Sequence, residues 1–299
     1  MYSSYGDLTS ARTVFDRMDR TKKNEVAWTS MITGYAKNQS PREALRLFSL
    51  MQQEGMLIDG VTMATAISAC GALKDLDNGK ELHRGIRQSR MRVCVVLGTA
   101  LVDMYSKCGE LELAREVFDA IPGKDRNVVS WSAMISGYSQ NNQGSEALKL
   151  FKKMVVNSDL KPNEVTAMAA LSACAQTGDL SLGKWIHAYF NKAQLDHSIS
   201  LMNSLVDMYS KCGKMDLAVE IFSEMPKKDI ISWNAMINGL AVNGQAMEAL
   251  DVFSEMTKAG ARPNDVTMIS HLSACAHRGL IEEGRKWFHR MDDFAVERG

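Results

Sequence analysis

The sequence predicts an all-α fold, an α-solenoid in which tandem helix–turn–helix repeats stack into one superhelix. Two observations predict it. Related motifs recur at a fixed spacing along the chain, and the recurring segments show helical periodicity of apolar residues, with no strand-like alternation. A single helical hairpin cannot bury both of its apolar faces, so neighbouring hairpins must stack into a continuous core. The stack is expected to be elongated and to present a concave surface.

Recurring motifs define a super-period of about 102 residues. Three W-x-x-M-I-x-G motifs begin 103 and 102 residues apart, at Trp28, Trp131 and Trp233. Three Ser-Ala-Cys tripeptides end 104 and 101 residues apart, at Cys70, Cys174 and Cys275. The super-periods divide into related repeats, which we place at 25–59, 60–94, 95–127, 128–163, 164–198, 199–229, 230–264 and 265–299, after a partial repeat at 1–24. We expect one repeat array over residues 1–299, truncated at both ends, because its first residues match Met104–Leu111, inside a later repeat.

Each repeat is expected to form two helices, as the segment 25–59 illustrates. Its second half carries one apolar stripe at helical spacing, formed by Ala44, Leu45, Leu47, Phe48 and Met51. Ser40 is expected to cap this helix, Pro41 suits its first position, and Glu43 is expected to complete a capping box. Gly55 and Gly260 suit left-handed caps after the second helices. Four prolines fall where a helix must stop, namely Pro122, Pro162, Pro226 and Pro263.

Composition and motifs argue against an enzyme. The 35 basic and 35 acidic residues balance, which gives no net charge for attracting nucleic acid, although a neutral total can hide a basic groove. No apolar run is long enough for a membrane helix. Six cysteines form no C-x-x-C pair, and no histidine begins an H-x-E motif. We therefore expect no catalytic residue, bound metal or cofactor, and we interpret the cysteines as small buried residues and His83 and His187 as packing residues.

Several motifs resemble pentatricopeptide repeat (PPR) proteins of the plant PLS subfamily. They are W-x-A-M-I-x-G-Y, E-A-L-x-L-F-x-x-M, L-S-A-C-A and V-D-M-Y-S-K-C-G, in one fixed order. The resemblance implies a right-handed superhelix that binds single-stranded RNA in mitochondria or chloroplasts, with editing-factor proteins as further partners. It also implies a fragment that lacks the E and DYW segments, the latter a zinc-dependent cytidine deaminase. The repeats 25–59, 128–163 and 230–264 resemble P repeats; 60–94, 164–198 and 265–299 resemble L repeats; and 1–24, 95–127 and 199–229 resemble S repeats.

In this family the fifth and last residues of a repeat contact the edge of one base; we call them the specificity pair. The resemblance gives five such pairs, Thr29 with Asp59, Thr99 with Asn127, Ser132 with Asn163, Asn203 with Asp229, and Asn234 with Asn264. The apolar second residue helps to sandwich the base, and these residues are Val26, Val96, Val129 and Ile231. Ser200 departs from that apolar pattern. The L-type pairs have little hydrogen-bonding capacity and receive no base, namely Ala64/Cys94, Met168/Ser198 and Ile269/Gly299.

The family's pairing rules then give an expected RNA. Thr or Ser with Asn selects A, Thr with Asp selects G, Asn with Asp selects U, and Asn with Asn prefers a pyrimidine, usually C. The RNA runs 5′ to 3′ from the N-terminus to the C-terminus of the protein. From the repeat 25–59 onward the expected target is 5′-G-n-A-A-n-U-C-n-3′, with U tolerated in place of the C. Its recognition is expected to direct organellar RNA editing or processing.

Alternatives remain for each feature. The array could instead be a protein- or peptide-binding solenoid of tetratricopeptide type, which the neutral charge favours mildly, whereas the repeat lengths and the in-register polar pairs favour RNA. Each polar pair could be a solvated helix start or a cap between repeats. The recurrent tryptophans are interpreted as core residues, with base stacking as the alternative. Three lysines late in the first helices could neutralise phosphates or be ordinary solvated side chains, namely Lys37, Lys107 and Lys211.

Overall fold

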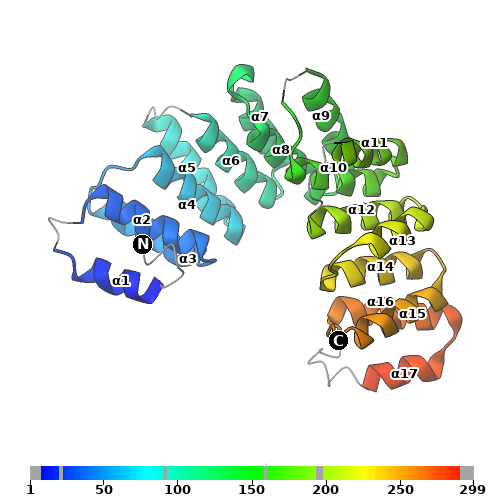
Figure 1. The fold of residues 1–299 in the computed structure, drawn as a ribbon. Coiled ribbons are helices and arrows are strands. Elements are labelled where there is room, and N and C mark those ends of the chain that lie inside the picture. Colours follow the sequence, from blue (N-terminus) through cyan, green and yellow to red (C-terminus); the bar gives the residue numbers. More distant parts are fainter. Residues whose placement is uncertain (1–7, 20–22, 90–92, 158–159, 193–197, 290–299) are drawn as a thin grey trace. The chain divides into compact units, whose positions relative to one another are not determined.

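The computed structural model describes residues 8–19, 23–89, 93–157, 160–192 and 198–289 (Figure 1). Within these ranges the secondary structure is 17 α-helices and one short 3-10 helix, with no strand. The prediction of an all-α solenoid is confirmed. The chain divides into two compact units, residues 1–161 and 162–299, and each is described by itself.

The N-terminal compact unit is a stack of helical hairpins. One helix of each hairpin packs directly on its counterparts, α2 on α4, α4 on α6 and α6 on α8, and the other helix lies outside this layer. We call these first and second helices. The elements are α1 (Leu8–Arg17), α2 (Glu25–Lys37), α3 (Pro41–Gln53), α4 (Gly60–Leu73), α5 (Leu76–Gln88), α6 (Val95–Lys107), α7 (Leu111–Ala120), the 3-10 helix (Gly123–Asp125), α8 (Val128–Gln140) and α9 (Gly144–Asn157).

The C-terminal compact unit repeats the arrangement. Its first helices form a layer in which α10 packs on α12, α12 on α14 and α14 on α16, and α11, α13 and α15 each pack between consecutive first helices. The elements are α10 (Glu164–Thr177), α11 (Leu180–Lys192), α12 (Ile199–Lys211), α13 (Met215–Glu224), α14 (Ile230–Val242), α15 (Ala246–Lys258), α16 (Asp265–Arg278) and α17 (Ile281–His289).

The start of α3 differs in part from the prediction. Pro41 does occupy the first position, but Ser40 makes no side-chain capping bond. Its hydroxyl donates to the carbonyl of Asn38 at 3.4 Å, and Glu43 forms an ion pair with Arg46 at 3.3 Å instead of reaching back to the cap. Ser40 also has φ −118° and ψ 60°, outside the extended conformation that a serine cap adopts. The capping box predicted for this helix is therefore wrong.

The predicted helix ends and the apolar stripe are confirmed. Gly55 and Gly260 have φ of +68° and +79°, in the left-handed region, and end the turns after α3 and α15. The four prolines lie between helices. On α3 the stripe is buried, apart from Leu45, which is half-buried; its buried members are Ala44, Leu47, Phe48 and Met51.

The three recurrent tryptophans belong to the core, as interpreted from the sequence, and their burial argues against base stacking. Trp28, Trp131 and Trp233 are only 6% to 7% exposed. Each ring packs edge to face with a phenylalanine from the preceding second helix, with ring centroids 4.8 to 5.2 Å apart, in the pairs Phe15–Trp28, Phe118–Trp131 and Phe222–Trp233. A buried edge-to-face pair stabilises the junction between hairpins.

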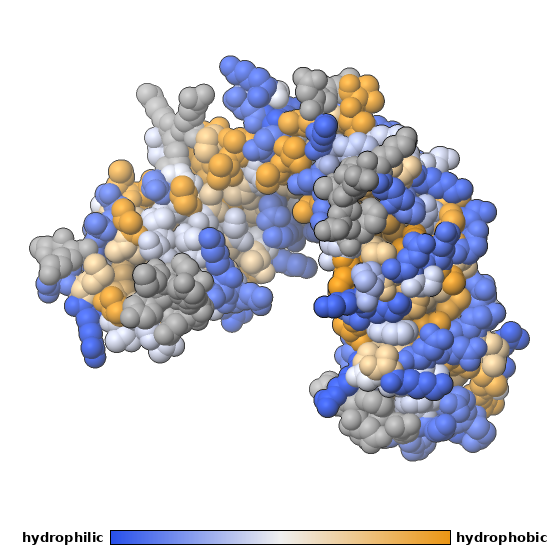
Figure 2. Space-filling model, viewed as in Figure 1, coloured by the Kyte–Doolittle hydropathy of each residue, from blue (hydrophilic) through white to orange (hydrophobic). Residues whose placement is uncertain are grey.

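The cysteines and the surface fit the composition. All six cysteines lie in the described residues, and none forms a disulfide. Cys70, Cys174 and Cys275 are buried, as predicted, whereas Cys108 and Cys212 are half-buried and Cys94 is exposed. Figure 2 shows hydrophilic and hydrophobic residues interspersed over the visible face. Among the described residues, no helix has the length and apolarity that spanning a bilayer requires.

Candidate functional site

A row of exposed aliphatic side chains marks the starts of the first helices. The second residue of seven predicted repeats is valine or isoleucine, and each is between 51% and 70% exposed. They are Val26, Val61, Val96, Val129, Val165, Ile231 and Val266. Ser200 takes the equivalent place in the repeat 199–229 and is also exposed. Aliphatic side chains recurring at one exposed position are candidates for contact with a ligand, since the hydrophobic effect favours burying them.

Sequence reasoning missed three members of this row. Val61, Val165 and Val266 lie in the repeats whose pairs have little hydrogen-bonding capacity, and were left out for that reason. The signal was available, because each valine follows the first residue of its repeat, as Val26 does. The aliphatic row therefore includes the repeats 60–94, 164–198 and 265–299 as well, and is interrupted only at Ser200 among these eight repeats.

The last residues of the repeats are N-caps, which was one of the two interpretations left open. Each lies in extended backbone and accepts, through its side-chain oxygen, the backbone N–H three residues later. The distances are 2.8 to 3.1 Å for Asp59, Asn127, Asn163, Asp229 and Asn264. Capping consumes one oxygen of each side chain and leaves the other terminal atom, an amide nitrogen in asparagine or a second carboxylate oxygen in aspartate.

Capping also keeps the two aspartates charged. Backbone and side-chain hydrogen bonds from Thr62 lower the pKa of Asp59. At Asp229 burial raises the pKa, but hydrogen bonds from Ser232 and Asn203 outweigh it, so the pKa is lowered overall. Both side chains are therefore carboxylates at neutral pH, acceptors with no proton to donate.

The fifth residues approach the caps in two repeats. Asn203 Nδ2 donates to Asp229 Oδ1 at 3.2 Å, and Asn234 Nδ2 donates to Asn264 Oδ1 at 3.1 Å. Both asparagines are buried. The structure thus brings together two of the five predicted pairs by direct hydrogen bonds.

The hydroxyl-bearing fifth residues behave differently. Thr29 contacts Thr62, with 2.6 Å between the hydroxyl oxygens, and so reaches Asp59 through a shared neighbour. Thr99 and Ser132 donate to carbonyls of their own helices, those of Val95 and Val128, at 2.7 and 2.8 Å. Ser132 lies in the N-terminal compact unit, whereas its predicted partner Asn163 belongs to the C-terminal one.

A groove joins these elements in the first complete repeat. A cavity of about 820 Å³, within the size range of ligand sites, lies along α2 and the start of α4. Its lining includes the whole predicted set of this repeat, Val26, Thr29 and Asp59, together with Val61 of the next repeat and Lys37. Two valines, one polar pair and a lysine thus line the same groove.

The lysines at the ends of the other first helices are partly neutralised. Lys107 Nζ lies 2.7 Å from Asp103 Oδ2, and Lys211 Nζ lies 2.9 Å from Asp207 Oδ2. Exposed ion pairs of this kind are weak, so the lysine ammonium groups can exchange the carboxylate for another anion such as a phosphate.

The L-type pairs have no common geometry. Ala64 is buried and Ile269 is 68% exposed, while Cys94 forms no capping bond. Ser198 caps α12 and also donates its hydroxyl to the carboxylate of Glu164. Gly299 lies outside the described residues.

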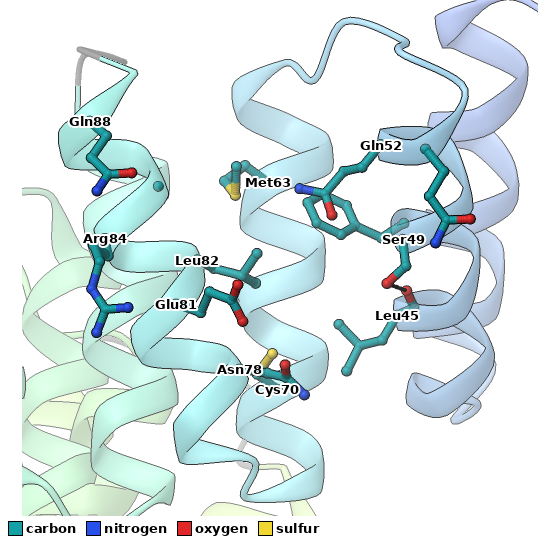
Figure 3. Close-up of a pocket in the computed structure, with 13 residues that line it drawn as sticks. Leu45, Ser49, Gln52, Met63, Cys70, Asn78, Glu81, Leu82, Arg84 and Gln88 are labelled. Carbon is teal, nitrogen blue, oxygen red and sulfur yellow. Dashed lines mark hydrogen bonds between the residues drawn. The ribbon is translucent and has the colours of Figure 1, made fainter.

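A second groove, shown in Figure 3, lies between α3, α4 and α5. Its volume is about 640 Å³, and side chains such as Ser49, Gln52, Glu81 and Arg84 line it. None of the predicted base-contacting residues is among its lining. It therefore belongs to the side of the second helices, away from the specificity pairs of the N-terminal compact unit.

The two recurrent histidines are packing residues, as predicted. His83 Nδ1 lies 2.8 Å from the Tyr105 hydroxyl, and His187 Nδ1 lies 3.0 Å from the Tyr209 hydroxyl. Burial lowers the pKa of His83. Within the described ranges, no group of three or more His, Cys, Asp or Glu side chains is arranged to hold a metal ion.

Family models match the same stretches that carry these features. The model of the PPR repeat family matches residues 23–72, 126–176 and 228–277, and the PPR repeat model matches 99–125, 200–230 and 272–295. The chain belongs to the PPR repeat family.

Plant relatives support the assignment over nearly the whole chain. The mitochondrial pentatricopeptide repeat-containing protein At2g22410 of Arabidopsis thaliana is 37% identical over 97% of this chain, and the chloroplastic protein At1g11290 is 39% identical over 97%. The chain spans only 46% and 35% of their lengths. The solved structure of maize PPR10, in complex with an 18-nt psaJ RNA element, has a TM-score of 0.50 and 14% identity, over 97% of this chain and 57% of that one. That likeness shows the fold.

Proposed function

We propose that this PPR protein binds single-stranded RNA sequence-specifically, with one base per repeat, and thereby directs RNA editing or processing in mitochondria or chloroplasts. Editing-factor proteins are proposed as further partners, and the repeat types are proposed to follow the PLS pattern. Relatives named as mitochondrial or chloroplastic, and a relative of the same fold solved with RNA, support the proposal.

The observation that carries the proposal is the groove along α2. A base is a flat ring whose faces are apolar and whose Watson–Crick edge carries donors and acceptors. Val26 and Val61 lie on the lining of the groove and would contact the two faces of one base. Thr29 and Asp59 line the same groove and would meet its edge. Aliphatic positions and polar pairs recur at one place per repeat, which matches the regular spacing of bases along an RNA strand better than the irregular surface of a protein ligand.

Capping supplies a physical basis for discrimination by the last residue. The capping oxygen faces the helix, so asparagine turns its N–H₂ outward and aspartate turns a carboxylate oxygen outward. Adenine N1 and cytosine N3 are acceptors, which match asparagine. Guanine N1–H and uracil N3–H are donors, which match aspartate. Asp59 and Asp229 are thus proposed to select G and U, and the asparagine caps to select A or C.

The experiment compares two RNAs of equal length on the full chain. The first is 5′-GCAACUCC-3′, which fits the proposed target, and the second exchanges every specified A for C and every C for A. Fluorescence anisotropy at one fixed salt concentration gives both affinities. Each mismatched base is expected to cost about 1–3 kcal/mol, by analogy with base contacts in DNA.

Equal affinity for both RNAs would contradict base recognition. Absence of RNA binding even at low salt, where phosphate contacts are strongest, would contradict RNA binding as a whole and favour a peptide-binding solenoid. Salt dependence of the anisotropy-derived affinity separates the phosphate contribution, to which Lys37 is expected to contribute, from base preference.

A further inference from the structure

Buried hydroxyls lie behind the specificity pairs. The third residue of five repeats is threonine or serine with 0% exposure, namely Thr62, Ser130, Thr166, Ser232 and Thr267. Each of these residues stands three positions after a cap. It belongs to one repeat, but its hydroxyl lies beside the cap, which is the last residue of the preceding repeat. Such side chains cannot touch RNA, so any effect on base preference must act through the residues that do.

Thr267 contacts both members of one specificity pair. Its hydroxyl oxygen accepts the backbone N–H of Asn264 at 3.1 Å, so its proton is free to be donated. That proton has two acceptors, Asn234 Oδ1 at 2.5 Å and Asn264 Oδ1 at 2.9 Å. Asn234 Nδ2 meanwhile donates to Asn264 Oδ1.

These bonds fix the direction of both amides. With both side-chain oxygens held at the Thr267 hydroxyl, the atoms of Asn234 and Asn264 left for a ligand are N–H donors. Cytosine offers the acceptors N3 and O2 to such a pair, whereas uracil presents the donor N3–H, which meets another donor. A rotated Asn234 amide would present an acceptor and would accommodate uracil.

Ser232 shows the alternative outcome in the preceding repeat. Its hydroxyl donates to Asp229 Oδ1 at 2.9 Å, and Asn203 Nδ2 donates to the same oxygen. The other amide atom, Asn203 Oδ1, is buried and has no hydrogen-bond partner. The hydroxyl of Ser232 therefore donates its single proton to the Asp229 carboxylate. The hydroxyl of Thr267 instead shares its proton between the amide oxygens of Asn234 and Asn264.

Thr62 makes the same link in the N-terminal compact unit. Its hydroxyl lies 2.6 Å from that of Thr29, and it hydrogen-bonds the Asp59 side chain. In four repeats, then, the buried hydroxyl contacts the side chain of the last residue, because Thr166 also donates to Asn163 Oδ1 at 2.7 Å. At Thr62 and Thr267 it also contacts the fifth residue. Ser130 instead donates to the backbone carbonyl of Asn127 at 2.8 Å.

We propose that the buried third-residue hydroxyl is a positioning residue for base specificity: it sets the preference of the repeat before it by fixing which atoms of the specificity pair face the RNA. The proposal rests on the proposed RNA-binding function. It assigns to Thr267 the preference of the repeat 230–264 for C over U.

The test measures C against U at one nucleotide. RNAs 5′-GCAACUCC-3′ and 5′-GCAACUUC-3′ differ only at the position assigned to Asn234 and Asn264, and are titrated against the parent chain and Thr267→Val. Valine keeps the size and shape of the side chain but removes the hydroxyl. The C-over-U affinity ratio is expected to fall about fivefold to tenfold, the effect of one hydrogen bond. Thr267→Ser, which keeps the hydroxyl, is expected to retain the parent ratio.

Two controls separate positioning from stability. Ser270→Ala removes another buried hydroxyl of α16, one that bonds only the Val266 carbonyl at 3.0 Å, and should leave the ratio unchanged. A loss of helix stability in Thr267→Val would weaken both RNAs equally and leave the ratio intact. An unchanged ratio in Thr267→Val overturns the inference, while discrimination by the parent chain keeps the proposed function. A parent chain that binds neither RNA overturns both.

Discussion

Close packing between first helices makes Gly137→Ala a direct test of the hairpin stack. Gly137 on α8 faces Ser106 on α6, and an added Cβ would lie 2.7 Å from Ser106 Cβ and closer still to its hydroxyl. Real Cβ atoms do not approach this closely, so one helix must move. Ser106 is itself 3% exposed and has little room to retreat.

The magnitude follows from two opposing effects. Overpacking a tight interface costs about 1–3 kcal/mol, whereas replacing a helical glycine by alanine returns about 1 kcal/mol. Gly85 in α5 is the matched control, because a Cβ there meets nothing within 4 Å. Gly85→Ala should be stabilised by about 1 kcal/mol, and the difference between the two variants, about 1–3 kcal/mol, isolates the clash.

Hydrogen exchange is the appropriate assay, because repeat arrays need not unfold as one cooperative unit. The free energy of opening is obtained from amide protection in α6 and α8, for Gly137→Ala, Gly85→Ala and the parent chain. Protection in α6 and α8 is expected to fall only in Gly137→Ala. Stabilisation of Gly137→Ala by about 1 kcal/mol, the gain expected without a clash, would refute the close approach of α6 and α8.

Three further predictions concern the core, the caps and the phosphate contacts. Trp131→Ala should cost about 3–5 kcal/mol of stability, seen as lost amide protection at the junction with Phe118. The variant that remains folded should rank RNAs with different bases in the same order as the parent chain. The folded-state pKa of Asp59 and of Asp229 is lowered. Their contribution to stability is therefore complete above roughly pH 4, the usual aspartate pKa, and is lost as the pH falls through the folded-state pKa values. When both are changed to asparagine, the free energy of unfolding in urea should fall less steeply as the pH is lowered. Lys107→Ala should weaken all RNAs alike and reduce the slope of log affinity against log salt by about one or less, whereas a selective loss for one base would contradict a phosphate role.

Much of the fold was predictable because its determinants are local or periodic. Spacing of the tryptophans, glycines and prolines placed the hairpins, and the left-handed glycines Gly55 and Gly260 were identified from their place after an apolar stripe. The start of α3 was mispredicted because Ser40 has the right residue type but the wrong backbone conformation, and type alone does not fix conformation.

The candidate site was predictable only at the level of positions. Sequence register located Asn234 and Asn264, but it could not show that Thr267, a residue of the next repeat, would hydrogen-bond both. That contact depends on how α14 packs against α16. The sequence left capping and base recognition as alternative roles for residues such as Asn264. The two roles are compatible, because the capping bond uses the side-chain oxygen and leaves the amide nitrogen.

The central claim, that a specificity pair selects one base, is tested most directly by Asn234→Thr. The substitution keeps Asn264 as the cap and brings a hydroxyl toward Thr267, as Thr29 faces Thr62. Four RNAs of the form 5′-GCAACUNC-3′, with each base at N, are titrated against the parent chain and the variant at one salt concentration. The parent should bind best with C at N and the variant with A, each mismatch costing about 1–3 kcal/mol. If the variant keeps the parent's ranking of the four bases, the pair does not select the base.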